Sequence, residues 1–539
     1  MQLHLKDDGT LTVNGDFTFT YENSGSSEDK DEIVLHHRSK LDVLGKTTLL
    51  KTGGRRVSVD VEADSKFYAR DSLLLIMDGG TTGFRFSVMD DAYLEVGKLL
   101  QLTTNDGGGD MDFNVTGGKA YIDGKMDLSS GQVGQDLDVT VDVTTTADYL
   151  EVTGDIVMSA QSQDDLKIDL NNMASLYIGG NFLRPTNFGS LQMENNTQLI
   201  YNSDTNQQTI ACNDMPGSGT DFFDLKNVQF NNTSGLGMQL EDTLTIDDEL
   251  SLASGIITTT DLKPIVLKDN ASITGGGTTT YIDGPIIKEG RIDGGSSMTL
   301  PLGHNSVYAP MSISKITNTV TTSSYKARFR SCPPPFGNQR ASSGLEGITE
   351  NQYWELETGP GSDSVNVELH WSDGPSIGIT NTAALVVAMG DEVTNPSNPE
   401  WVSIGQGNLT GDINTGSVMN MISCPPPFGN TKFTIGTSDA ALSPLPVELT
   451  AFDLRQINQN VEISWETATE VNASHFDVER SIDGQNFETI GSVRAAGNSV
   501  STQWYDLTDD DVFAGVYYYR LRQVDLDGMS TTYEIKSIE

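Results

Sequence analysis

The sequence predicts an all-β protein in which a parallel β-helix is followed by two β-sandwich domains. Two observations lead to this prediction. Short runs of alternating apolar and polar residues recur at an even spacing through the first part of the chain. The five tryptophans, in contrast, all lie between Trp354 and Trp504. The change in composition predicts a β-helix over residues 1–285, a β-sandwich over 286–440 and a second β-sandwich over 441–539.

The repeat unit is a run with apolar side chains at alternate positions around one small or polar residue, as in "LTVNGDFTF" and "LEVTGDIVM". Such alternation indicates a strand with one buried face. A fixed period without helical patterning is typical of stacked β coils, so we favour a parallel β-helix over a tandem of β-sandwiches. The centres recur every 26 to 30 residues, at Gly15, Gly45, Asp71, Lys98, Gly124, Gly154 and Gly180.

Proline usage agrees with stacked coils. The first 184 residues contain no proline, as expected where every interior coil must donate backbone hydrogen bonds to its neighbours. The last region reads instead as short strands separated by turns, which is typical of a β-sandwich. Asp483–Gly484 and the stretch 525–528 are the predicted turns, and Trp465 and Tyr519 are predicted core residues.

The charge balance restricts the partners. The chain has 33 Lys and Arg against 75 Asp and Glu, a net charge of −42. A surface this acidic argues against nucleic acid and anionic membrane surfaces as partners, since both need a basic surface. The longest apolar stretch, "AALVVAM" at 383–389, is far shorter than the roughly 20 residues that span a bilayer. We therefore expect no insertion into a membrane.

Three stretches of the last region carry a family resemblance: "SPLPVELTAFDL" (443–454), "VEISWETATEVNASHFDVERSIDGQNFETIG" (461–491) and "AGVYYYRLRQVDLDG" (514–528). They resemble a module of large secreted and cell-surface proteins of the Bacteroidetes, and the looser resemblance begins near residue 275. The resemblance implies a fibronectin type III-like sandwich and export by the type IX secretion system. In that group a sorting domain follows and a signal peptide precedes, so we interpret this chain as a processed form or a fragment.

The octapeptide SCPPPFGN occurs twice and contains two of the three cysteines, Cys332 and Cys424. The extracellular location implied by the resemblance permits disulfides. Two equivalent loops at one end of a sandwich would bring these cysteines together, so we predict a Cys332–Cys424 disulfide. Two free or buried thiols in duplicated loops are the alternative, and Cys212 is predicted to be buried.

No catalytic motif is evident. None of the six histidines, among them the pair His36–His37, stands in a nucleophile, zinc or phosphate motif. The glycine-rich "NDGGGDMD" places Asp106, Asp110 and Asp112 close together. Such oxygen ligands suit Ca²⁺, although a solvated acidic turn has the same sequence. We expect no other cofactor.

These observations predict a non-catalytic extracellular protein, a rod-like part of an adhesin or of a self-assembling appendage on the cell surface. Its expected partners are further copies of the chain or other surface proteins, and possible targets include glycans or other cell surfaces. Two alternatives stay open. Exposed aromatic residues on one face would favour a glycan-binding module. A line of Asp, Lys and Arg on one face would favour a carbohydrate-active β-helix enzyme, a polysaccharide lyase or hydrolase.

Overall fold

The computed structural model describes most of the chain. It leaves out residues 1, 23–30, 81, 107–108, 132–135, 144–147, 162–164, 186–187, 212–222, 292–296, 316–322, 337–338, 341–343, 350, 360–361, 363, 375–376, 380, 423–428, 440–448, 468–469, 471–472, 498, 500–501, 511, 514 and 526–529. The described residues form strands and turns, with no α-helix among them. They divide into two compact units: residues 1–331 with 354–367 and 424–430, and residues 332–353 with 368–423 and 431–539. Each unit is described by itself.

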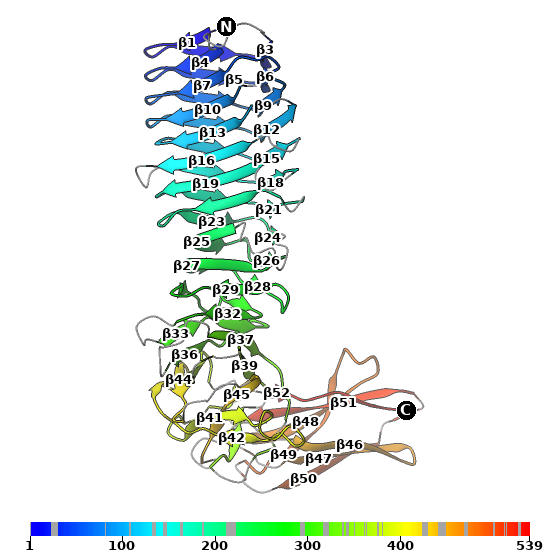
Figure 1. The fold of residues 1–539 in the computed structure, drawn as a ribbon. Helices are drawn as coiled ribbons and strands as arrows, with labels where there is room; N and C mark the ends of the chain where they lie inside the picture. The colour runs from blue at the N-terminus through cyan, green and yellow to red at the C-terminus, as the bar shows by residue number, and fades with distance from the viewer. Residues whose placement is uncertain are drawn as a thin grey trace. The chain divides into compact units, whose positions relative to one another are not determined.

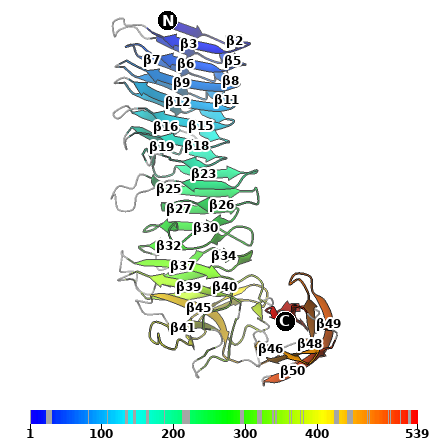
Figure 2. The same cartoon turned by 90° about the vertical axis from the view of Figure 1, so that its right-hand side faces the viewer.

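The first unit is a parallel β-helix, which confirms the predicted fold of this region. Its coils stack in Figures 1 and 2 as successive layers, and strands β1 to β26 make about nine turns. Each coil contributes one strand to each of three faces. Face A consists of β1 (Gln2–Leu5), β4 (Asp31–Leu35), β7 (Val57–Val61), β10 (Phe84–Met89), β13 (Met111–Thr116), β16 (Leu137–Val143), β19 (Leu166–Asn172) and β22 (Ser190–Met193).

Faces B and C follow face A in every coil. Face B consists of β2 (Thr10–Val13), β5 (Lys40–Val43), β8 (Lys66–Ala69), β11 (Tyr93–Val96), β14 (Lys119–Ile122), β17 (Tyr149–Val152), β20 (Ser175–Ile178) and β23 (Gln198–Ser203). Face C begins with β3 (Phe17–Tyr21), β6 (Thr47–Lys51), β9 (Ser72–Asp78), β12 (Leu99–Asp106), β15 (Lys125–Ser130), β18 (Ile156–Ser159), β21 (Phe182–Leu183), β24 (Gln208–Ala211) and β26 (Met238–Leu240).

Parallel pairing continues beyond these coils. The long strands β25 (Phe223–Asn232) and β27 (Leu244–Ser254) pair in parallel, and face C extends through β28 (Ile257–Thr258) and β31 (Ile282–Asp283) to β34 (Leu302–His304). The direction changes where β32 (Ile286–Glu289) pairs antiparallel with β37 (Ser324–Arg330). The domain boundaries at 285 and 440 stay predictions.

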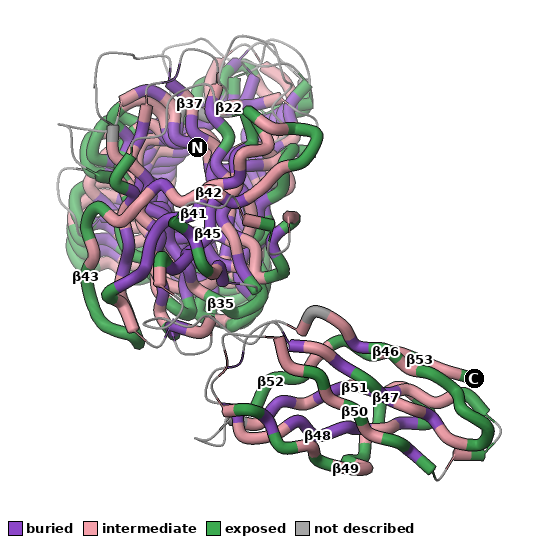
Figure 3. Tube along the Cα trace, turned by 90° about the horizontal axis from the view of Figure 1, so that it is seen from below, coloured by how far each residue is buried: buried purple, intermediate pink, exposed green. Residues whose placement is uncertain are grey.

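The interior of the helix explains the repeat. In most strands of the coils, for example β13, β15 and β19, alternate residues are buried and the residues between them are half-buried or exposed. Figure 3 colours the chain by this burial. Many repeat centres are glycines because they lie at the corner between faces B and C. A Cβ on Gly124, whose φ is +146°, would collide with the backbone carbonyl of Lys98 in the preceding coil. Glycine alone permits that approach.

The second unit contains two separate hydrophobic clusters. The first gathers Leu345, Ile348, Val386, Ala388 and Trp401. Its strands pair antiparallel: β38 (Gly347–Ile348) and β41 (Leu385–Gly390) both pair with β45 (Asn430–Thr437), and β42 (Trp401–Ser403) pairs with β41.

The second cluster lies in residues 449–539, which we call the C-terminal module. One antiparallel sheet contains β46 (Leu449–Ile457), β47 (Asn460–Thr467) and β50 (Gln503–Asp509), and the other contains β48 (Ala473–Ser481), β49 (Glu488–Arg494), β51 (Tyr517–Asp525), β52 (Ser530–Thr532) and β53 (Lys536–Ile538). Residues of both sheets share one core that includes Trp465 and Tyr519, as predicted. The predicted turn Asp483–Gly484 joins the antiparallel strands β48 and β49, and most of the second predicted turn, 525–528, lies outside the described residues.

Candidate functional site

The outward side of face A carries a line of charged residues. In-register pairing places Arg85 of β10 beside Asp112 of β13, Asp112 beside Asp138 of β16, and Asp138 beside Lys167 of β19. Neighbouring strands lie about 4.8 Å apart, so these four side chains occupy consecutive levels of one column. We call this column the charged ladder.

Burial and like charge act together on the two carboxylates of the ladder. The pKa of Asp138 is raised to about 6, first by burial and then by the neighbouring charges of Asp169 and Asp112. The pKa of Asp112 is also raised, by burial and by Asp110. The positive charge of Lys167 lowers the pKa of Asp138 only slightly, because its Nζ pairs with a carboxylate oxygen of Asp169 at 2.9 Å. Like charges in register are therefore an energetic cost that the fold tolerates here.

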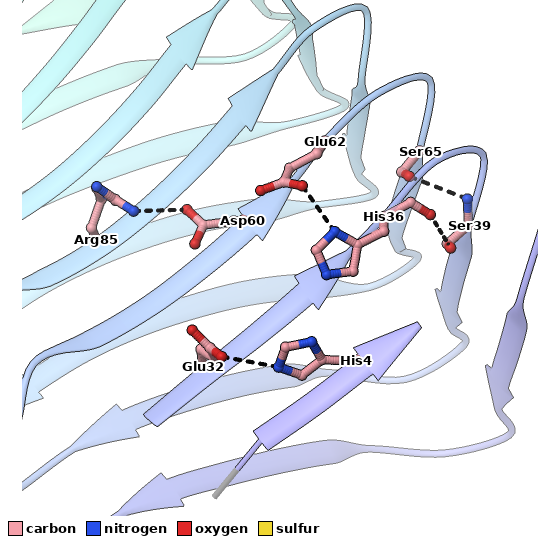
Figure 4. A network of polar contacts seen from close by, with 8 residues as sticks. All are labelled: His4, Glu32, His36, Ser39, Asp60, Glu62, Ser65 and Arg85. Atoms are coloured by element: carbon pink, nitrogen blue, oxygen red, sulfur yellow. Dashed lines mark hydrogen bonds and ion pairs between the residues drawn. The ribbon is translucent and has the colours of Figure 1, made fainter. Parts of the chain in front are cut away.

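The first coils of face A pair complementary polar groups instead (Figure 4). His4 Nε2 lies 3.0 Å from Glu32 Oε1, and His36 Nδ1 lies 3.0 Å from Glu62 Oε2. Arg85 reaches back to Asp60 with a hydrogen bond of 3.2 Å. His36 thus belongs to a row of paired polar groups, while its sequence neighbour His37 is exposed in the turn that follows.

The predicted calcium ligands occupy one edge of this region. Asp110 is exposed in the loop before β13, and Asp112 points outward from β13 between the buried Met111 and Phe113. The backbone of Asp106 ends β12, and its side chain lies outside the described residues. Among the side chains that the structure describes, no group of three or more His, Cys, Asp or Glu could hold a metal ion. Calcium binding stays a prediction.

The structure describes only one of the two cysteines of the predicted disulfide. Cys332 is exposed, whereas Cys424 and Cys212 lie outside the described residues. The Cys332–Cys424 bond stays a prediction.

The outward side of face B carries aromatic residues, which the sequence reasoning missed. Five tyrosines project from five consecutive coils, and all are half-buried: Tyr68, Tyr93, Tyr121, Tyr149 and Tyr177. We call them the tyrosine face. The two "YLEV" strands, β11 and β17, were a visible signal. The repeat was defined by its apolar, inward positions, and the tyrosines lie at the outward positions between these.

Register arranges the tyrosines as a checkerboard with charged residues. One column reads Tyr68, Glu95, Tyr121, Glu151 and Tyr177. The adjacent column reads Lys66, Tyr93, Lys119 and Tyr149. Rings of the two columns meet edge to face, with centroids 6.0 Å apart for Tyr68 and Tyr93 and 5.8 Å apart for Tyr149 and Tyr177.

The tryptophans contribute little exposed aromatic surface. Trp354, Trp371, Trp401 and Trp465 are buried, as expected for core residues. Trp504 of the C-terminal module is the exception, with 72% of its surface exposed. The five tyrosines on the outward side of face B are half-buried aromatic residues placed by the coil register.

Comparisons with known proteins identify no family. No family model matches the chain, and no curated protein matches it. Among solved structures, a match is the crystal structure of a β-1,2-glucanase from Parabacteroides distasonis, at 13% identity and a TM-score of 0.14. The alignment covers 40% of this chain and 36% of that chain, and so low a TM-score supports no argument about fold or function. In the described part of the chain, no helix is long and apolar enough to cross a membrane.

Proposed function

We propose that the protein is a non-catalytic extracellular protein whose β-helix acts as a rigid, extended scaffold in a cell-surface adhesin or appendage. The observation that carries this proposal is the outward side of the β-helix. Tyrosines stand at the same register position on every second coil, in two adjacent columns that run from β8 to β20. A solenoid of this kind offers a long surface for adhesion.

The C-terminal module supports the proposed location. Its two antiparallel sheets share one core built around Trp465, Phe476 and Tyr519, an arrangement compatible with a fibronectin type III-like sandwich. The motifs of residues 443–528 resemble those of Bacteroidetes surface proteins. We therefore propose export by the type IX route and display at the cell surface, with further copies of the chain as partners.

Surface display can be tested on intact cells of the native host. Proteinase K added to washed cells should digest the chain while a cytoplasmic marker stays intact. Negative-stain microscopy of the shed surface material, with mass spectrometry of its chains, should then find this chain in rods, rings or fibres. A chain protected from protease until the cells are lysed would contradict the proposal. Light scattering that gives a monomer at every concentration would count against self-assembly.

A carbohydrate-active enzyme is the second candidate, and the charged ladder favours it. Asp112 and Asp138 stand side by side on neighbouring strands, and retaining glycosidases likewise use two carboxyl groups placed close together. The raised pKa of Asp138 would suit a general acid. A reducing-end assay over a polysaccharide panel tests this candidate. Activity that Asp138→Asn abolishes would replace the non-catalytic proposal.

A further inference from the structure

The spacing of the tyrosine face is set by the coils. Tyr68, Tyr121 and Tyr177 stand at one register position on every second coil. Neighbouring strands are about 4.8 Å apart, so these rings are about 10 Å apart and the column spans about 19 Å. Tyr93 and Tyr149 repeat the same two-coil interval in the adjacent column. An extended β-1,4-linked glycan repeats every two sugars at nearly this interval, which brings the same face of alternate sugars over successive rings.

The central ring is available for such a contact. Tyr121 makes no hydrogen bond or ring contact in the part of the chain that the structure describes. Tyr68, at the end of the column, is different because the Arg70 guanidinium lies 4.0 Å from its ring centroid. The aromatic platform is therefore most open in the middle of the face. A pyranose ring packs its axial C–H groups against an aromatic face, and polar side chains beside it fix the orientation of the sugar.

The charges between the rings suit sugar hydroxyl groups. Glu95 and Glu151 flank Tyr121 in its own column, and Lys119 flanks Tyr93 and Tyr149 in the next. Carboxylates accept hydrogen bonds from hydroxyl groups and the ammonium group donates them. Because the chain carries a net charge of −42, long-range repulsion disfavours polyanionic glycans. A neutral polysaccharide fits both the local and the overall charge.

We propose that the tyrosine face binds an extended, neutral β-1,4-linked polysaccharide, with the chain running along the stack of coils across Tyr68, Tyr121 and Tyr177. The inference rests on the proposed adhesive function, for which it supplies the ligand. A purely structural role is the competing explanation, because tyrosines favour strands and gain stability from cross-strand pairs. That explanation predicts an effect on stability and none on binding.

The test uses the purified full chain in native gels that contain hydroxyethyl cellulose, and calorimetric titration with cello-oligosaccharides. We expect retardation in the gel, and an affinity that rises from cellotetraose to cellohexaose as a third ring is reached. The double variant Tyr121→Ala/Tyr177→Ala should bind at least about tenfold more weakly. Tyr121→Phe keeps the ring and should bind within about twofold of the unmodified chain. Tyr121→Leu keeps the apolar bulk of the strand without the aromatic face and should lose affinity as Tyr121→Ala does.

The matched control is Asn114→Ala, a half-buried outward residue on face A of the same coil as Tyr121, and its binding should not change. Three results would overturn the inference: no retardation by hydroxyethyl cellulose, retardation by polygalacturonate alone, or full affinity in both the double variant and Tyr121→Leu. None of these results bears on surface display, which protease treatment of intact cells measures separately. Failure of the inference is thus distinguishable from failure of the proposed function.

Discussion

Strands β13 and β16 of the β-helix and the C-terminal module use charged residues in opposite ways. On face A, Asp112 and Asp138 stand in register with like charges beside each other. In the C-terminal module, opposite charges meet: Arg480 lies 3.1 Å from Asp509, and Arg522 lies 2.6 Å from Asp477. A parallel stack brings the same repeat position of neighbouring coils together, whereas antiparallel sheets bring different sequence positions together. Charges therefore contribute to folding in the module and oppose it at points on the helix surface, where a cost to stability is compatible with binding or catalysis.

The largest expected effect concerns the core that holds the coils together. Phe86 is fully buried and its ring stacks between Phe67 and Phe113, with centroids 5.9 and 5.5 Å away. Phe86→Ala should lower the free energy of unfolding of the helix by about 4 kcal/mol, because it leaves a cavity between coils. Hydrogen exchange with mass spectrometry would show loss of protection in the strands around β10. The adjacent Arg85→Ala, on the exposed side of the same strand, should cost less than about 1 kcal/mol.

The next effect tests the paired charges of the module. Asp509 is buried, accepts a 2.8 Å hydrogen bond from Tyr519 Oη and pairs with Arg480. Asp509→Ala should destabilise the module by about 3 kcal/mol because it leaves the Arg480 charge and the Tyr519 hydroxyl without this partner. Exchange protection should fall in residues 449–539 and not in the β-helix. Asp453→Ala removes an exposed ion pair to Lys536 and should change the stability by less than about 1 kcal/mol.

The third change, Asp138→Asn, should raise the stability of the β-helix, whereas the two preceding variants lower stability. Burial and like charge raise the pKa of Asp138 in the folded chain to about 6 from its usual 3.8. A raised carboxyl pKa means that stability is full below about pH 4 and is lost as the pH rises through 6. Asp138→Asn should therefore stabilise the β-helix at pH 7 by about 1 kcal/mol, allowing for solvent screening, and leave its stability at pH 4 unchanged. Urea unfolding of both proteins at pH 7 and pH 4 measures the difference in stability. An equal change in stability at the two pH values would contradict the raised pKa of Asp138.

These contrasts mark how far the sequence could predict the molecule. Alternation around Gly15 to Gly180 predicted the parallel β-helix because most inward residues of successive coils are apolar. The same alternation fixes which residues face outward but not which lie side by side, since this depends on the register between coils 26 to 30 residues apart. The juxtapositions Asp112–Asp138 and Tyr121–Glu151 therefore emerged only from the strand pairing. Core residues such as Trp465 were predictable because burial follows from their own strand pattern.

The smallest expected effect on stability separates the tyrosine face from the core. Tyr121 is half-buried and has no ring partner among the described residues, so Tyr121→Ala should destabilise the β-helix by about 0.5 kcal/mol. The matched control is Phe113→Ala. Phe113 points inward from the preceding strand of the same coil, and its loss should lower the free energy of unfolding several-fold more. Urea unfolding of both variants measures the difference. A tyrosine that matters little for folding, yet recurs on every second coil of its column with Tyr68 and Tyr177, is best explained by a ligand. A loss for Tyr121→Ala as large as that for Phe113→Ala would instead make the tyrosine face part of the scaffold.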